Sequence, residues 1–271
     1  QPAHATLLRQ YQRFLEGAER EGSASVGDAP RSSVVDDISD RGYRLEQDHD
    51  GEAAERAYAE ALATDPDHGP TLRRLASLLE RGGRLDEAER LLRRAVELAP
   101  RDGWSHGLFA RFLSRQRRAL DEADAHYRLA IAAGLHDPRW LGEYARFLHG
   151  ERHERERAEK FWRRALDADA GPDVLVDYAR ALEAARPDDA AKLYRAAVEA
   201  SPDDVYPLRA YARFLEDVRE DADGAEDAYA LALARAPSDV LTHDVYAGFL
   251  ERRRRDDLRA ASHYLCAARA E

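Results

Sequence analysis

The residues best suited to bind a ligand are arginines that recur at regular intervals along the chain. Four of them stand at one register, Arg111, Arg146, Arg180 and Arg213. A guanidinium presents a fork of N–H donors that matches a carboxylate in two parallel hydrogen bonds. If these arginines lie on successive helices, they form a positive stripe, and the chemistry of such a stripe is the capture of acidic groups.

The sequence shows no arrangement of side chains that is typical of a catalytic site. The sequence contains no P-loop, dinucleotide fingerprint, nucleophile elbow or zincin motif. His149 and His153 have the i, i+4 spacing of metal ligands, but no third ligand accompanies them. We therefore expect a protein that is not an enzyme and that has no metal and no other cofactor.

The composition indicates which classes of molecule the protein could bind. A net charge of −11 opposes bulk attraction to nucleic acid or to an anionic membrane. No apolar run reaches the roughly 18 residues that span a bilayer, and the N-terminus has no signal-peptide pattern. Cys266 is the only cysteine, so it cannot form an internal disulfide, and we expect it to be a buried small apolar group. These features predict a cytoplasmic protein with a protein or peptide partner.

The elements that must position the arginines are defined by three columns of small residues, each recurring seven times. The first column is Gly42, Ala76, Ala110, Ala145, Ala179, Ala212 and Ala247. The second is Ala54, Ala88, Ala123, Ala158, Ala190, Ala225 and Ala260. The third is Ala61, Ala95, Ala130, Ala165, Ala197, Ala232 and Ala267. The second and third columns keep one constant separation, whereas the separation of the first and second varies, as it would across a turn between two helices.

Large residues keep the same register. One set stands three residues after the first column and is leucine throughout: Leu45, Leu79, Leu113, Leu148, Leu182, Leu215 and Leu250. The other stands three residues before the third column: Tyr58, Leu92, Tyr127, Trp162, Tyr194, Tyr229 and Tyr264. Small residues allow two helices to approach, and large residues fill the space beside each contact. Each unit is therefore a helix pair that buries its apolar face only by stacking on its neighbours.

This pattern resembles the tetratricopeptide repeat family. The best match is residues 68–101, through Leu72, Leu75, Ala76, Leu79, Ala88, Leu92, Ala95 and Pro100, and the resemblance covers about residues 34–271. It implies an all-α fold, a right-handed α-α superhelical solenoid of about seven helix pairs. The fourth unit, with Trp140, Tyr144, Phe147, Phe161 and Trp162, is also similar to the half-a-tetratricopeptide repeats of RNA-processing scaffolds.

The repeats divide the chain into segments. We expect an N-terminal helix at 1–20, a degenerate repeat or cap, and a flexible linker at 21–33. The alternatives for the helix are a self-inhibitory arm that lies in the groove and a remnant of a longer array. Seven repeats then follow, at about 34–67, 68–101, 102–136, 137–171, 172–203, 204–238 and 239–271. No polar capping helix follows Ala267, so the last repeat is expected to contact a second copy, forming a homodimer, or other residues.

In the resembling family, partners lie on the concave surface that the first helices line. Arg180 and Arg213 each precede a glutamate by three residues, which predicts a surface ion pair in each case. No glutamate follows Arg111 or Arg146 at that spacing, so these two are expected to be the least neutralised, although Glu143 could still pair with Arg146 from the other side. Glycines four residues before each, Gly107 and Gly142, are expected to leave room in the groove. The candidate partner-binding residues are Trp104, Arg111, Ser114, Arg139, Arg146, His149, Arg180, Arg209 and Arg213.

The leading hypothesis is a non-enzymatic scaffold that holds a partner segment, acidic or with a free carboxyl terminus, in the concave groove. One alternative is a peptide-sensing regulatory domain of a larger protein, and another is an RNA-processing scaffold. The simplest alternative for the arginine stripe itself is an ordinary solvated surface, because exposed helices are rich in charged residues.

Overall fold

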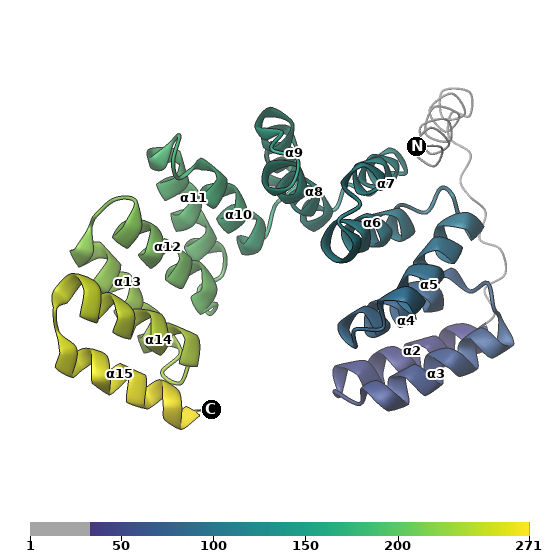
Figure 1. Ribbon diagram of the computed structural model, residues 1–271, viewed down its shortest axis with the longest axis horizontal. Helices are drawn as coiled ribbons and strands as arrows, with labels where there is room; N and C mark the ends of the chain where they lie inside the picture. Colours follow the sequence, from purple (N-terminus) through teal and green to yellow (C-terminus); the bar gives the residue numbers. More distant parts are fainter. Residues whose placement is uncertain (1–32, 271) are drawn as a thin grey trace. The chain divides into compact units, whose positions relative to one another are not determined.

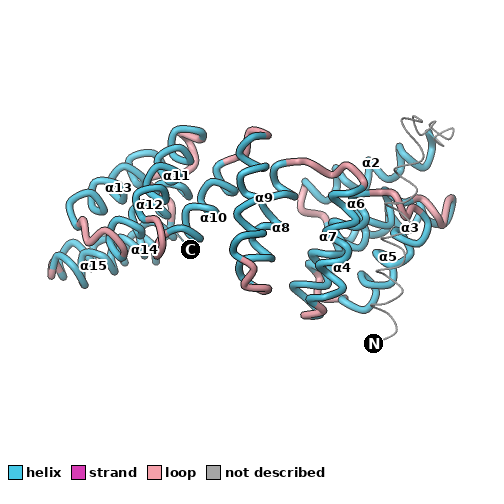
Figure 2. Tube along the Cα trace, turned by 90° about the horizontal axis from the view of Figure 1, so that it is seen from above, coloured by secondary structure: helices cyan, strands magenta, loops and turns pink. Residues whose placement is uncertain are grey.

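The structure of the protein is a computed structural model, in which residues 33–270 are described (Figure 1). Within that range it contains fourteen α-helices in seven sequential pairs, and no strand (Figure 2). The predicted all-α architecture of seven helix pairs is thereby confirmed. The expected helix at 1–20, and the expected linker up to residue 32, lie outside the described residues.

The helix pairs fall into two compact units, separated between His136 and Asp137. Unit one holds pairs one to three, which are α2 (Ser33–Gln47) with α3 (Gly51–Thr64), α4 (Gly69–Arg81) with α5 (Leu85–Leu98), and α6 (Gly103–Phe112) with α7 (Leu120–Ala132). Unit two holds pairs four to seven, which are α8 (Pro138–Gly150) with α9 (Arg155–Asp167), α10 (Pro172–Leu182) with α11 (Pro187–Ala200), α12 (Val205–Asp217) with α13 (Ala222–Arg235), and α14 (Val240–Phe249) with α15 (Asp257–Ala270).

The predicted packing columns form the core of both units. Every small residue of the three columns is buried, and most of them have no accessible surface. At Gly42 a β-carbon would come within 2.6 Å of the Tyr58 ring, so this contact requires glycine. The large residues of the two anchor sets are also buried, except Leu45 in the first pair and Tyr264 in the last.

First helices begin where short polar residues cap them. The side chains of Asp102, Asp137, Asp204 and Asp239 accept hydrogen bonds from backbone N–H groups in the first turns of α6, α8, α12 and α14. Such caps satisfy donors that have no partner within the helix. Two of these aspartates also form an ion pair with the preceding first helix, Asp102 with Arg73 and Asp239 with Arg209. The cap thereby fixes the start of one helix against its neighbour.

The turns inside pairs three and seven contain a feature that the sequence did not reveal. The first helices of these pairs continue into one π-helical turn each, η1 (Leu113–Arg117) and η2 (Leu250–Arg254). Each ends at an arginine with positive φ, Arg118 at 55° and Arg255 at 58°. In the first of these turns, Arg117 forms ion pairs with Asp86 and Glu89. In the second, Arg254 forms ion pairs with Asp223 and Glu226. Each turn therefore links its helix pair to the pair before it.

The two faces of each unit differ in how closely their helices approach. First helices contact one another in sequence, α2 with α4 and α4 with α6 in unit one, and α8 with α10, α10 with α12 and α12 with α14 in unit two. Second helices instead make their main contacts with first helices. The first helices therefore form one continuous surface in each unit, and the second helices stand further apart on the other side.

The last helix corrects one expectation. Cys266 is exposed on α15, and it is not the buried apolar group that its position beside Ala267 predicted. Leu258 and Leu265 on the same helix are also exposed, at 86% and 57%. A helix buries only the stripe that faces its pair partner, and Cys266 lies outside that stripe.

Candidate functional site

Three arginines of unit two share one register on consecutive first helices. Arg146 lies on α8, Arg180 on α10 and Arg213 on α12, and all three are exposed. Because these helices pack side by side, the three side chains belong to one continuous surface. We refer to Arg146, Arg180 and Arg213 as the arginine face. The fourth arginine of the predicted stripe, Arg111, lies on α6 in unit one.

Arg146 is the most neutralised member of the face, which contradicts the expectation that it would be among the least. It forms ion pairs with Glu143 one turn earlier and with Asp177 on α10, where the Nη1 to Oδ2 distance is 2.9 Å. Spacing along the helix of Arg146 indicated Glu143 as a possible partner, but it could not indicate Asp177. Asp177 comes from the next repeat, so the pair depends on how the first helices stack.

Arg180 does not form the predicted ion pair with Glu183. The hydroxyl of Tyr194 on α11 donates a hydrogen bond to Glu183 instead. The guanidinium of Arg180 lies 5.7 Å from the centre of the Tyr206 ring on α12, in a cation–π contact. The neighbours of Arg180 are therefore tyrosines rather than a carboxylate, so its positive charge is not compensated by an ion pair within residues 33–270.

Arg213 also lacks its predicted partner. Glu216 is only 3% exposed, and it accepts hydrogen bonds from Tyr229 on α13 and from Arg252 of η2. Among residues 33–270, Arg213 forms no ion pair. Arg180 and Arg213 are therefore the two members of the face without a carboxylate, the reverse of what their spacing predicted.

One local rule explains both lost pairs. Five helix pairs have a tyrosine as the anchor before the third column, and in four of them its hydroxyl donates to a glutamate four residues after the first column. The pairs are Tyr58 with Glu46, Tyr194 with Glu183, Tyr229 with Glu216, and Tyr264 with Glu251. A tyrosine and a glutamate recur together at these registers, so the sequence did contain the signal that Glu183 and Glu216 serve packing.

Other predicted residues of unit two have different environments. Arg209 is largely buried, and its Nη1 lies 2.8 Å from Asp239, so it holds the cap of α14 rather than facing solvent. Arg139 is exposed near the start of α8. His149 packs against the Trp162 ring at 5.5 Å, and burial lowers the pKa of its imidazole, with Arg155 and His153 adding to the effect.

In unit one, the predicted residues lie on α6 and η1. Trp104 is half exposed. The Nη2 atom of Arg111 lies 4.0 Å from Glu80 on α4. Ser114 is buried, and its hydroxyl donates to the carbonyl oxygen of Arg111 at 2.9 Å. The structure therefore brings Arg111 and Ser114 together, but it uses the serine hydroxyl internally.

The two groove glycines are packing residues and do not leave the room that their spacing suggested. A β-carbon on Gly142 would meet Val174 of α10 at 2.8 Å, so glycine permits α8 and α10 to approach. Gly107 is buried within α6. The expectation of open space below Arg111 and Arg146 is accordingly wrong.

The charge on the arginine face is set by few carboxylates. Burial raises the pKa of the Asp177 carboxyl, although Arg146 and Arg180 both oppose that shift.

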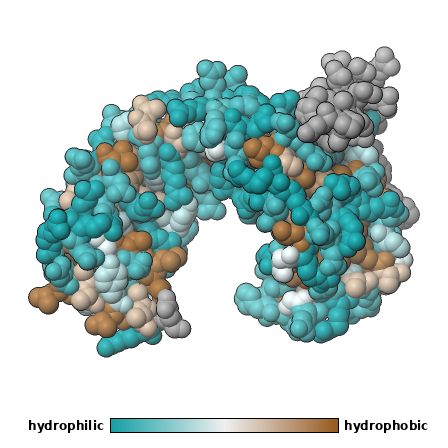
Figure 3. All heavy atoms as spheres, viewed as in Figure 1, coloured by the Kyte–Doolittle hydropathy of each residue, from teal (hydrophilic) through white to brown (hydrophobic). Residues whose placement is uncertain are grey.

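Figure 3 shows that polar residues cover most of the visible surface of each unit. Across residues 33–270, no group of three or more His, Cys, Asp or Glu side chains could hold a metal ion. None of the helices in this range is long and apolar enough to cross a membrane.

Comparison with known proteins agrees with this geometry. Residues 45–112 match the family model for the tetratricopeptide repeat. No curated protein matches the sequence. Among solved structures, the fold is similar to a tetratricopeptide repeat protein from Parabacteroides merdae, with a TM-score of 0.65 and 13% identity over 88% of this chain and 94% of that one.

Two further bacterial structures share the fold. One is PilF from Pseudomonas aeruginosa, with a TM-score of 0.59 and 21% identity over 74% of this chain and 90% of that one. The other is a thermophilic tetratricopeptide repeat protein from Thermus thermophilus, with a TM-score of 0.58 and 20% identity over 67% of this chain and 99% of that one. At these identities the likeness concerns the fold alone.

Proposed function

We propose that this chain is a tetratricopeptide repeat protein and that its arginine face binds a partner polypeptide through acidic side chains or a free carboxyl terminus. Repeats of this kind generally serve as non-enzymatic scaffolds for other proteins. The observation that carries the proposal is that Arg180 and Arg213 are exposed and form no ion pair with residues 33–270, although each has a glutamate three residues further along.

The local chemistry fits a carboxylate ligand. Charge-assisted hydrogen bonds from arginine to carboxylate contribute roughly 1.5–3 kcal/mol each where they are shielded from water, and less at an exposed surface. Arg146 lies on the neighbouring first helix, and its guanidinium is engaged by Glu143 and Asp177, so the proposal does not depend on it. Because the whole chain carries a charge of −11, specificity for an acidic segment would depend on this local positive surface.

The test is a selection of random peptides displayed on phage against the protein. The selected peptides are then measured by calorimetry against the double variant Arg180→Glu, Arg213→Glu. We expect acidic peptides to be enriched, and their affinity to fall at least tenfold in the double variant. Both side chains lie outside the packing columns, so the melting temperature should change little.

The matched control is Lys160→Glu with Arg235→Glu. These residues are exposed on the second helices α9 and α13, and the change in net charge is the same. If acidic peptides lose affinity equally in both double variants, only bulk charge matters and the face is an ordinary solvated surface. If RNA but no peptide binds, and added salt abolishes that binding, a nucleic-acid scaffold replaces the proposal.

A further inference from the structure

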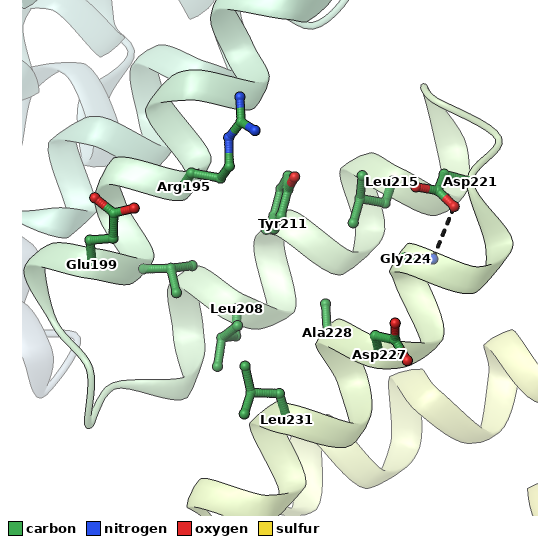
Figure 4. A pocket seen from close by; sticks show the side chains of 11 residues that line it. Arg195, Glu199, Leu208, Tyr211, Leu215, Asp221, Gly224, Asp227, Ala228 and Leu231 are labelled. Carbon is green, nitrogen blue, oxygen red and sulfur yellow. Dashed lines mark hydrogen bonds between the residues drawn. The ribbon is translucent and has the colours of Figure 1, made fainter.

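A recess of about 360 Å³ lies in unit two between α11, α12 and α13. That volume is near the lower end of the range for sites that hold small ligands or single side chains. Its walls are mainly apolar, and Figure 4 shows them facing one another across the opening. The apolar lining consists of Val198, Leu208, Tyr211, Leu215, Ala228 and Leu231.

The recess exists because one position of α13 carries a small residue. Three residues after the second column, the other pairs of unit two and pairs two and three of unit one have a large side chain: Leu91, His126, Phe161, Leu193 and His263. In pair four Phe161 packs against Tyr144 with ring centres 4.6 Å apart, and in pair seven His263 packs against Tyr246 at 4.7 Å. Pair six has Ala228 there, so Tyr211 faces open space.

Tyr211 also lacks the hydrogen-bond partners of its counterparts. The hydroxyl of Tyr144 accepts a hydrogen bond from Arg157 at 2.7 Å, and that of Tyr246 accepts one from Arg259 at 2.6 Å. The residue that corresponds to these arginines in pair six is Gly224, whose N–H is capped by Asp221.

A second type of partner is missing as well. The hydroxyl of Tyr178 donates to Glu159 on the preceding second helix, and that of Tyr246 donates to Glu226. The corresponding residue for Tyr211 is Ala191. Within residues 33–270, the Tyr211 hydroxyl therefore forms no hydrogen bond, and it lines the recess with its donor and acceptor available (Figure 4).

The rim of the recess is predominantly acidic. Glu199 and Asp227 are exposed, and neither forms an ion pair with the described residues. Asp221 adds a third carboxylate, whereas Arg195 is the single cation of the lining. Leu231 is 44% exposed beside them, which leaves an apolar surface next to negative charge. A ligand that complements this site has a bulky apolar group and a positive group close to it.

We propose that this recess is a second docking site, which takes a partner peptide that inserts one bulky aliphatic or aromatic side chain beside a lysine or arginine. A hydroxyl, amide or backbone group of the same peptide would pair with the Tyr211 hydroxyl. The site lies between two second helices, α11 and α13, and the first helix α12, and its charge is opposite to that of the arginine face. The two sites therefore select different peptides, and either proposal can fail without the other.

The test is a phage-displayed random peptide selection on the wild-type protein, with peptides that also bind the Ala228→Leu variant removed. Leucine occurs at this register in pairs two and five, so the variant is expected to fold and to fill the recess. The matched control is Ala230→Leu, the same substitution two residues later at an exposed position of α13 outside the lining. Selected peptides are synthesised and measured by calorimetry.

We expect the enriched peptides to combine a bulky apolar residue with a neighbouring lysine or arginine. Their affinity should fall at least tenfold in Ala228→Leu, about threefold in Tyr211→Phe and about tenfold in the exposed rim variant Glu199→Arg with Asp227→Arg. Ala230→Leu and the variant Arg180→Glu, Arg213→Glu should bind normally. The rim variant keeps the test decisive if Ala228→Leu fails to fold.

Three results would overturn the proposal. The first is that no peptide is enriched, or that the enriched peptides are acidic. The second is that the selected peptides bind Ala228→Leu or the rim variant as tightly as the wild type. The third is that sedimentation shows self-association of the wild type that Ala228→Leu abolishes, because a second copy of the chain would then be the occupant.

Discussion

The Nδ1 atoms of His106 on α6 and His126 on α7 lie 2.8 Å apart in the interior of pair three. The Nε2 atom of His106 is 3.0 Å from the carbonyl oxygen of Pro100, and so it must carry a proton. When both rings are neutral, His106 Nδ1 is the acceptor and His126 Nδ1 the donor, whereas protonation of both rings would set one N–H against the other. Pair seven repeats the arrangement with His243, His263 and Pro237, at 2.9 Å for both contacts.

This histidine pair predicts a loss of stability in mild acid. Burial lowers the pKa of His106, and burial together with His106 and Arg93 lowers that of His126 to about 3. Below about pH 6.5 the unfolded chain binds protons at these rings more readily than the folded chain does. The free energy of unfolding should therefore decrease from pH 7 to pH 5, by at most about 1.4 kcal/mol per pH unit for each histidine.

Urea unfolding at pH 7, 6 and 5 measures this slope. His126→Leu places at this register the residue found in pairs two and five, and it should make the slope shallower. His136→Leu, which replaces an exposed histidine outside the pair, is the control variant. An unchanged slope in His126→Leu would show that the pair does not couple folding to protonation.

The helix pairs could be predicted from the sequence because their packing is periodic. Ala145 and Ala179 mark the same contact in successive repeats, and a contact between helices at fixed spacing leaves the same requirement for a small residue each time. Burial at these positions is a local property of each pair. The two π-helical turns could not be predicted, because Arg117 and Arg254 in these turns form ion pairs with acidic residues of the preceding helix pair, and such contacts between repeats do not follow from local spacing.

The charge pairing of the candidate site was less predictable than the fold. Arg146 is neutralised by Asp177 from the next first helix, a contact that spacing along one helix does not contain. Glu183 and Glu216 are engaged by tyrosines of their own second helices, and only comparison of the repeats as a set reveals that rule. The recess beside Ala228 was equally hard to predict, because the small size of this residue is apparent only when it is compared with the residues at the same register in other repeats.

Overpacking of a first-column position should destabilise unit two. Ala179 has no accessible surface, so Ala179→Leu is expected to lower the free energy of unfolding by roughly 1–3 kcal/mol. Ala234→Leu, at an exposed position of α13, is the control and should change stability by less than about 0.5 kcal/mol. Urea unfolding of both variants decides the point, and equal stabilities would mean that the helix register is misassigned.

The cap that links α12 to α14 should contribute more to stability than a cap alone. Asp239 accepts a hydrogen bond from the Thr242 N–H at 2.8 Å and pairs with Arg209, whose side chain is 17% exposed. Asp239→Ala removes the cap and leaves a largely buried guanidinium without its carboxylate, so we expect a loss of about 2–3 kcal/mol.

The control for that loss is Asp137→Ala, which removes the cap of α8 at an exposed residue. Its expected cost is about 1 kcal/mol. Thermal unfolding monitored by circular dichroism compares the two variants. Comparable losses would show that the Arg209 pair adds nothing beyond the cap, and Arg209 would then be available to a ligand after all.

Removal of a carboxylate from the arginine face should strengthen binding of an acidic peptide. Asp177 lies 2.9 Å from Arg146 and acts on Arg180 as well, so Asp177→Asn leaves both arginines less neutralised. We expect the affinity for peptides selected on this face to rise roughly threefold to tenfold, or about 0.7–1.4 kcal/mol. Stability should change little, because a buried charge is removed while Arg146 keeps Glu143.

The control is Asp188→Asn, which removes the same charge at an exposed residue of α11. The gain should shrink as salt is added, since exposed charges are screened within about 10 Å at 0.1 M salt. If Asp177→Asn and Asp188→Asn bind the peptide with equal affinity, the carboxylate ligand does not contact the arginine face.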